Sequence, residues 1–252
     1  MSRLPYLRAG SGPVLVLVHG YLGGSAQWKR EIAHFSTRFD VIAPDLPGFG
    51  DAADLPGCDT IAAMAEAVYA LLVELGVTEF NLLGHSMGGM IVQQIAADHP
   101  EAVQKLVLYG TGPLGLMPDR FELIETSRER LCADGVKRTI ERIGATWFKA
   151  GSDAESLPLL VDIGARANPQ AALAALSAMA GWDGRPALPR LTMPTQIVWG
   201  DADRSYRWPQ VHSLWTGIPE ARLAVVPGTS HALHLEKPQL FLALVSDFLF
   251  DP

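Results

Sequence analysis

Short runs of apolar residues, each bounded by turn residues, recur along this chain. They are VLVLV at 14–18, DVIAP at 40–44, FNLLG at 80–84, KLVLYG at 105–110, QIVWG at 196–200 and RLAVVPG at 222–228. Runs that are apolar almost throughout, without alternation, are typical of strands buried on both faces, as in parallel sheets. The pattern therefore predicts the strands of a mostly parallel sheet.

Between several of these runs the apolar residues change to helical spacing. One such stretch follows Thr60, a good N-cap, and stops at Gly76, a good C-cap. A second follows Ser86 and ends before Pro100, and a third, at 237–250, closes the chain. Strands that alternate with helices predict right-handed crossovers and a doubly wound α/β sheet.

Residues 112–186 depart from this alternation because they carry helical spacing without strand runs. One helical stripe consists of Phe121, Ile124, Arg128 and Leu131, and another of Val136, Ile140, Ile143 and Trp147. We therefore predict a core domain formed by residues 1–111 and 187–252, interrupted by a helical insertion at 112–186.

A serine flanked by glycines stands where the third apolar run ends. Gly84-His85-Ser86-Met87-Gly88 has the pattern G-x-S-x-G, with a predicted strand before it and a predicted helix after it. A serine on so tight a turn adopts strained backbone angles, and side chains two residues away on either side would collide. The context predicts a nucleophilic Ser86 raised above the sheet edge at a helix N-terminus.

A serine hydroxyl needs a base to take its proton, and histidine is the usual one. His231 follows the last apolar run and precedes the final helix, so its loop is expected at the same sheet edge as Ser86. His234 is the nearest alternative. Polar, helix-like stretches hold His34, His99 and His212.

A carboxylate that orients the imidazole is expected between the serine and the histidine in the chain. The stretch GDAD at 200–203 offers Asp201 and Asp203 directly after a predicted strand. We favour Asp203, because Asp201 is better placed to cap the turn.

Two backbone N–H groups are needed to stabilise an oxyanion. Met87, directly after the nucleophile, is expected to supply one. The second would come from Tyr21, in the glycine-rich stretch HGYLGG that follows the first apolar run. A phosphate cradle is a weaker interpretation of that loop, since no GK[ST] follows.

The composition limits which binding partners and which cellular compartment we expect for this protein. Twenty basic and 27 acidic residues give a net charge of −7 with no basic cluster, which argues against nucleic acid. Cys58 and Cys132 are far apart and belong to no metal-binding pattern, so we expect neither a disulfide nor a metal. The N-terminal stretch lacks the apolar segment of a leader or membrane span. A cytoplasmic protein is therefore expected.

Five stretches in this order carry a resemblance to a known superfamily: VLVLVHGYLGG, APDLPGFG, LLGHSMGGMI, MPTQIVWGDAD and PGTSHALHLEKP. They resemble the α/β hydrolases over nearly the whole chain. The resemblance implies a Ser86–Asp203–His231 triad, oxyanion amides at Tyr21 and Met87, and a lid at about 112–186. It also implies hydrolysis of a small-molecule ester or enol-lactone through an acyl-enzyme, with no cofactor.

Two other functions stay open on the same scaffold. The first is hydrolysis of carbon–carbon bonds in ring-fission products, which His85 and Ala232 make less favoured than ester cleavage. The second is a slow-turnover ligand receptor. An apolar substrate pocket would draw on aromatic and neighbouring residues of the loops and insertion. The candidates are Trp28, His85, Phe121, Trp147, Trp182 and Trp208. Either a monomer or a homodimer fits the sequence.

Overall fold

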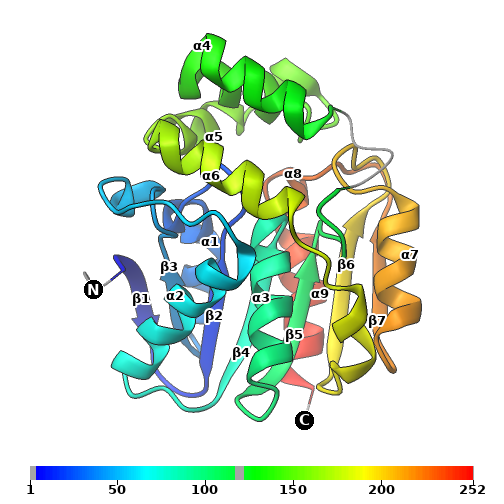
Figure 1. The fold of residues 1–252 in the computed structure, drawn as a ribbon. Coiled ribbons are helices and arrows are strands. Elements are labelled where there is room, and N and C mark those ends of the chain that lie inside the picture. The colour runs from blue at the N-terminus through cyan, green and yellow to red at the C-terminus, as the bar shows by residue number, and fades with distance from the viewer. Residues whose placement is uncertain (1–3, 117–121, 252) are drawn as a thin grey trace.

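The computed structural model describes residues 4–116 and 122–251. Its sheet has seven strands in the order β1-β3-β2-β4-β5-β6-β7. Their bounds are β1 Tyr6–Gly10, β2 Val14–Val18, β3 Asp40–Pro44, β4 Phe80–His85, β5 Val103–Tyr109, β6 Thr195–Gly200 and β7 Arg222–Val226. All neighbours pair in parallel except β1, which runs antiparallel to β3 (Figure 1). The predicted doubly wound, mostly parallel sheet is confirmed.

The edge strand β1 was not predicted by the sequence pattern. Its residues YLRAG are half-buried or exposed, so they form no continuous apolar run. Arg8 on this strand donates two hydrogen bonds to the Asp40 carboxylate, at 2.9 and 2.6 Å. The short, charged edge limits pairing with other chains.

Helices cover both faces of the sheet (Figure 1). On one face lie α1 (Lys29–Phe35) and α9 (Pro238–Phe250), and on the other lie α2 (Ile61–Glu74), α3 (Met87–Asp98) and α7 (Trp208–Gly217). Side chains of β2 alternate between the two faces: Leu15 and Leu17 pack with α1 and α9, whereas Val16 and Val18 pack with α2 and α3. Both faces are thus buried, as the apolar runs predicted.

The capping signals at either end of α2 are also confirmed. The Thr60 hydroxyl accepts a hydrogen bond of 3.1 Å from the Ala63 N–H, and Gly76 follows the helix with φ 70°. The remaining short elements are η1 Ser25–Trp28, η2 Gly50–Ala52, η3 Gly151–Asp153, η4 Arg185–Arg190 and α8 Leu233–Glu236. The helix α1 contains His34, which the sequence placed on a polar, helix-like stretch.

Three helices lie between β5 and β6 in the chain: α4 (Ile124–Ala145), α5 (Leu157–Gly164) and α6 (Pro169–Ala180). This α4–α6 segment sits above the carboxyl ends of the strands (Figure 1). Gly135, with φ 74° and ψ 174°, interrupts α4 between the two apolar stripes that the sequence predicted. Within the segment Arg128 binds Ser177, and a backbone hydrogen bond of 2.9 Å from Asn168 to Gly48 joins the segment to the core.

Candidate active site

Ser86 occupies a strained turn between β4 and α3. Its φ of 57° and ψ of −120° are uncommon for a residue with a side chain and cost about 1–3 kcal/mol. The turn is held by its own backbone: the Ser86 N–H donates to Tyr109 O at 3.0 Å, and the Ser86 carbonyl accepts from Gly89 N–H at 2.9 Å. Thr111 Oγ1 also donates to that carbonyl, at 2.8 Å. Backbone strain that the surrounding structure holds in place is common at functional sites.

The glycines around Ser86 are required by close backbone contacts, as predicted. A Cβ on Gly84 would lie 2.3 Å from Gly88 O, and one on Gly88 would lie 2.3 Å from Val18 O. A Cβ on Gly89 would lie 2.5 Å from the side chain of Thr111. These positions allow α3 to begin directly against β2, β4 and the loop after β5.

The loop after β2 lies against Ser86. A Cβ on Gly20 would come within 2.9 Å of Ser86 Cβ and 3.4 Å of Ser86 Oγ. His19 fixes this loop, because its Nδ1–H donates to Gly20 O at 2.8 Å and its Nε2 accepts from Leu46 N–H at 3.0 Å. Burial lowers the pKa of His19, which keeps the ring neutral and able to accept. The role of His19 was not predicted.

The two residues predicted to supply oxyanion amides are next to this contact in the chain. Tyr21 directly follows Gly20, which touches Ser86. Met87 is the first residue of α3, where backbone N–H groups have no partner inside the helix and the helix dipole is positive. The arrangement has the polarity that a developing oxyanion requires.

His231 and Asp203 form a buried pair at the same edge of the sheet. His231 Nδ1 lies 2.9 Å from Asp203 Oδ2, and the two side chains are 2% and 0% exposed. The other oxygen, Asp203 Oδ1, accepts from the Ser205 N–H at 2.7 Å and the Tyr206 N–H at 3.1 Å. A carboxylate only accepts, so Nδ1 carries the proton and Nε2 is left with its lone pair. This is the tautomer of a general base.

The two alternatives have other contacts. Asp201 is exposed, and its Oδ1 accepts from the Gly228 N–H at 2.7 Å, which is the capping role expected of it. His234 is fully buried, with Nδ1 2.9 Å from the Tyr109 hydroxyl. Burial lowers the pKa of His234 to about 3, with smaller contributions from His231 and Arg30. Neither Asp201 nor His234 takes part in the buried pair that Asp203 and His231 form.

The Gly110 turn packs against the rings of His231 and His85. A Cβ on Gly110 would lie 3.2 Å from His231 Nδ1 and 3.5 Å from Cδ2 of His85, the residue before Ser86. Among residues 4–116 and 122–251, no hydrogen bond joins the Ser86 hydroxyl to the His231 ring, whose polar contact is Asp203. Catalytic hydrogen bonds are often long before substrate binds.

The residues predicted to line the substrate pocket lie in different parts of the structure. Trp147 lies at the site, with its ring centroid 5.8 Å from that of His231. Trp182 joins the end of α6 to α3 by donating to Gln94 Oε1 at 3.1 Å. Trp28 is fully buried on the α1 and α9 face, with its ring centroid 6.2 Å from that of His85 and 5.2 Å from that of His234. Trp208 is 44% exposed on α7, next to His212. Phe121 is outside the described residues.

His85 faces the His231 loop. Its ring centroid is 4.6 Å from that of His231 and 4.4 Å from that of Tyr109, on which it stacks at 19°. Burial holds the pKa of His85 well below its ordinary value, and the neighbouring His231 and His234 add to this effect. Tyr109, which ends the run KLVLYG, was not predicted to contribute; its polar hydroxyl at the end of an apolar strand was the available signal.

In the part of the chain that the structure describes, no helix is both long and apolar enough to cross a bilayer. Among the same residues, His, Cys, Asp and Glu side chains form no group of three that could hold a metal ion.

The fold agrees with comparisons to known proteins. A family model described as alpha/beta hydrolase fold matches residues 13–134. A pimeloyl-[acyl-carrier protein] methyl ester esterase of Aeromonas hydrophila is 30% identical, over 96% of this chain and 97% of its own length. The chain therefore belongs to the α/β-hydrolase family, and it is an ester hydrolase of that fold.

Solved structures show the same architecture. An enol-lactonase from Burkholderia xenovorans superposes with a TM-score of 0.89 at 23% identity, over 98% of this chain and 96% of that one. A thermophilic esterase from Thermogutta terrifontis also gives 0.89, at 26% identity, over 98% and 92% of the two chains.

Proposed function

We propose that this protein cleaves a small-molecule carboxylic ester or enol-lactone, with Ser86 as nucleophile, His231 as general base and Asp203 as the group that orients His231. The observation that carries the proposal is the buried Asp203–His231 pair at the sheet edge where the strained Ser86 turn stands. The Ser86 turn and the Asp203–His231 pair are far apart in the chain. A serine nucleophile needs a base, and an imidazole oriented by a carboxylate is such a base.

The reaction would proceed in two balanced halves. His231 Nε2 takes the hydroxyl proton as Ser86 Oγ attacks the ester carbonyl, and the N–H groups of Tyr21 and Met87 stabilise the oxyanion. The tetrahedral intermediate collapses, the proton passes from His231 to the leaving alcohol or enol oxygen, and an acyl-serine remains. Water then attacks the acyl group with the same base, releasing the acid and restoring Ser86.

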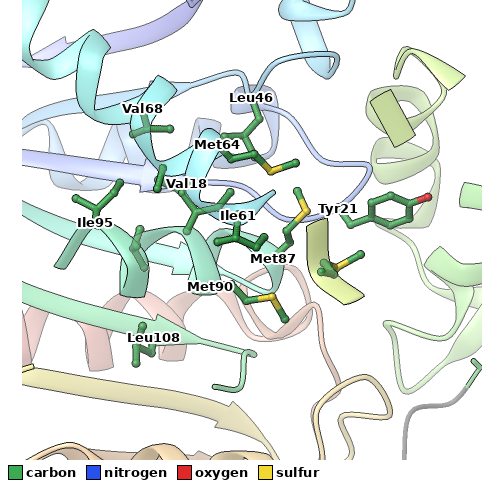
Figure 2. Packing of buried hydrophobic residues seen from close by; sticks show 14 of the residues in the cluster. Val18, Tyr21, Leu46, Ile61, Met64, Val68, Met87, Met90, Ile95 and Leu108 are labelled. Carbon is green, nitrogen blue, oxygen red and sulfur yellow. The ribbon is translucent and has the colours of Figure 1, made fainter. Parts of the chain in front are cut away.

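The walls around Ser86 favour an apolar acyl group. Tyr21 and Met87 belong to one buried cluster with Ile140, Ile143 and Met179 of the α4–α6 segment. Figure 2 shows Tyr21 pointing away from the sheet toward that segment, and Met64, Met87 and Met90 gathered beside it. Methionine side chains adapt their shape readily, which suits acyl groups of different length.

Residues 112–186 are proposed to act as a lid that closes over the acyl group. Three features support this role: the α4–α6 segment lies above the carboxyl ends of the strands, it contributes Trp147 to the surroundings of His231, and its apolar residues belong to the same buried cluster as Tyr21 and Met87. Exclusion of water by such a segment strengthens the electrostatic interactions of the site.

The test is a panel of p-nitrophenyl esters from acetate to octanoate, methyl esters and enol-lactones, assayed with the wild type and Ser86→Ala. The wild type should hydrolyse esters and Ser86→Ala should lose at least about a thousandfold in kcat/KM. Ser246→Ala, an exposed hydroxyl on α9 that contacts His34, is the matched control and should keep full activity.

Mass spectrometry adds an independent measurement. A fluorophosphonate should add once to the wild type and not to Ser86→Ala. Equal ester hydrolysis by wild type and Ser86→Ala would contradict the proposal, as would labelling of both proteins.

A further inference from the structure

The peptide carbonyl of His231 receives two hydrogen bonds from buried side chains of the sheet. The Tyr109 hydroxyl, at the end of β5, donates to it at 2.8 Å. His85 Nε2, at the end of β4, donates to it at 3.1 Å. These two bonds join the loop that carries the proposed general base to the end of β4, which leads into the Ser86 turn, and to the end of β5, the next strand in the sheet.

The protons around Tyr109 have one consistent arrangement. The His231 carbonyl only accepts, so the hydroxyl proton points to it. The Tyr109 oxygen then accepts from the His234 N–H at 3.1 Å and from His234 Nδ1–H at 2.9 Å. A hydroxyl that accepts two hydrogen bonds becomes a stronger donor. Burial raises the pKa of Tyr109 well above its ordinary value, so this donor stays protonated.

Asp203 alone does not fix the position of His231. Its carboxylate holds the ring at Nδ1, which sets the rotation of the side chain but not the place of the peptide. On the other side of the loop, the Ala232 N–H donates to Trp147 O at 2.8 Å, next to the α4–α6 segment. Without the two bonds from the sheet, the His231 carbonyl would lose its partners, although Thr229 and Ser230 would still bind Ala202.

We propose that Tyr109 and His85 are positioning residues, which hold the His231 peptide so that Nε2 of its ring comes into line with the Ser86 hydroxyl. Neither residue is assigned contact with the substrate. This inference rests on the proposed serine-hydrolase function and assigns His85 a role different from the pocket role that the sequence suggested.

The expected effect is on turnover and not on substrate binding. Displacement of a catalytic group by about 1 Å can lower a rate about a hundredfold. Tyr109→Phe removes only the hydroxyl and should lower kcat for a p-nitrophenyl ester by about 10- to 100-fold, with KM changed less than about threefold. His85→Leu should do the same.

A conservative variant separates the hydrogen bond from the ring. In His85→Gln the side-chain amide nitrogen reaches about as far as Nε2 and can donate to the His231 carbonyl. His85→Gln should therefore recover most of the kcat lost in His85→Leu. A role in packing alone would predict the opposite, because leucine fills the apolar space at least as well as glutamine.

Thr195→Val is the matched control for loss of a buried hydroxyl. Thr195 Oγ1 donates to Met193 O at 3.0 Å at the start of β6, the opposite end of the sheet from the site. This variant should lose stability in urea unfolding to an extent similar to Tyr109→Phe and keep the wild-type kcat.

The outcomes are distinct. A Tyr109→Phe enzyme with kcat within about twofold of wild type, or equal losses in His85→Gln and His85→Leu, would overturn the positioning role while leaving the proposed function intact. Full activity of Ser86→Ala would overturn the proposed function itself. If Tyr109→Phe fails to fold, the rates at which a fluorophosphonate labels Ser86 in the two His85 variants decide the question.

Discussion

The turn that carries Ser86 and the loop that carries His231 are held in place by different physical means. The Ser86 turn is fixed by backbone geometry. A Cβ on Gly84 or Gly88 would lie only 2.3 Å from a carbonyl oxygen, so these positions require glycine. The His231 loop is fixed by side chains, with Asp203 on the ring and Tyr109 and His85 on the peptide.

The difference explains why one part is readable in the sequence and the other is not. Steric requirements at the turn fall on adjacent residues and leave a local pattern, G-x-S-x-G. Hydrogen bonds to the loop come from residues 28, 122 and 146 positions away in the chain. Substitutions of the turn glycines should therefore act mainly on folding, and substitutions around the His231 loop should act mainly on catalysis.

The largest expected effect is on the loop side. Asp203→Asn keeps the shape but permits the wrong tautomer of His231, so kcat should fall by about a thousand- to ten-thousandfold with little loss of stability. Ester hydrolysis and urea unfolding are the measurements. Asp201→Asn, two residues away and bound to Gly228 N–H, should keep kcat within about twofold. Equal losses in the two variants would contradict the assignment.

On the turn side, Gly88→Ala places a methyl group 2.3 Å from Val18 O and 2.6 Å from His19 O. Both are backbone atoms, so we expect a loss of about 3 kcal/mol or more in the free energy of unfolding. Gly181→Ala is the control, because its nearest atom, Ser177 O, is 3.5 Å away. Urea denaturation of both variants tests the comparison; similar stabilities would show that steric fit does not set the turn.

Glu31, on α1 and three residues after Trp28, is a buried polar side chain that extends this comparison. Neither Glu31 oxygen has a partner among the described residues, and burial raises the pKa of Glu31 to about 7. A carboxyl whose pKa is raised on folding contributes its stability fully below the unfolded pKa, and the contribution is lost as the pH rises through about 7.

Glu31→Gln should therefore gain stability relative to the wild type between pH 5 and pH 8. The gain has an upper limit of about 3 kcal/mol, at 1.36 kcal/mol for each pH unit of pKa difference. Urea unfolding of both proteins at the two pH values measures it. Parallel pH profiles for the two proteins would exclude Glu31 as the cause.

The smallest expected effect concerns the link between the loop and the α4–α6 segment. Glu236 accepts from Lys149 N–H at 2.7 Å through Oε1 and from Ser230 N–H at 2.6 Å through Oε2. Glu236→Gln loses one acceptor and should lower the free energy of unfolding by about 1 kcal/mol. Thermal unfolding tests this, with the exposed Glu155→Gln as a control; a Glu236→Gln protein as stable as that control would show that the bridge adds nothing.

Much of the fold follows from the sequence because the apolar runs are long and uninterrupted. The central strands, the Thr60 cap and the break between the two stripes of α4 were predicted from local patterns. The edge strand β1 was missed, since a half-exposed strand leaves little periodic signal, and the seven-residue α1 was indicated only as a helix-like stretch around His34. An aromatic residue such as Trp208 leaves the same pattern whether it lines a site or the surface, so its pocket role stays a prediction; the structure places it on α7, 44% exposed.

By itself, the sequence determined the α/β alternation and the place of the strained serine, because both depend on neighbours within a few residues. The tertiary structure decided which aspartate meets His231, and that His85 and Tyr109 donate to its peptide carbonyl while Trp28 packs beside His85 and His234. These choices depend on which side chains the sheet order brings together at one edge, and residue spacing along the chain does not encode that distance.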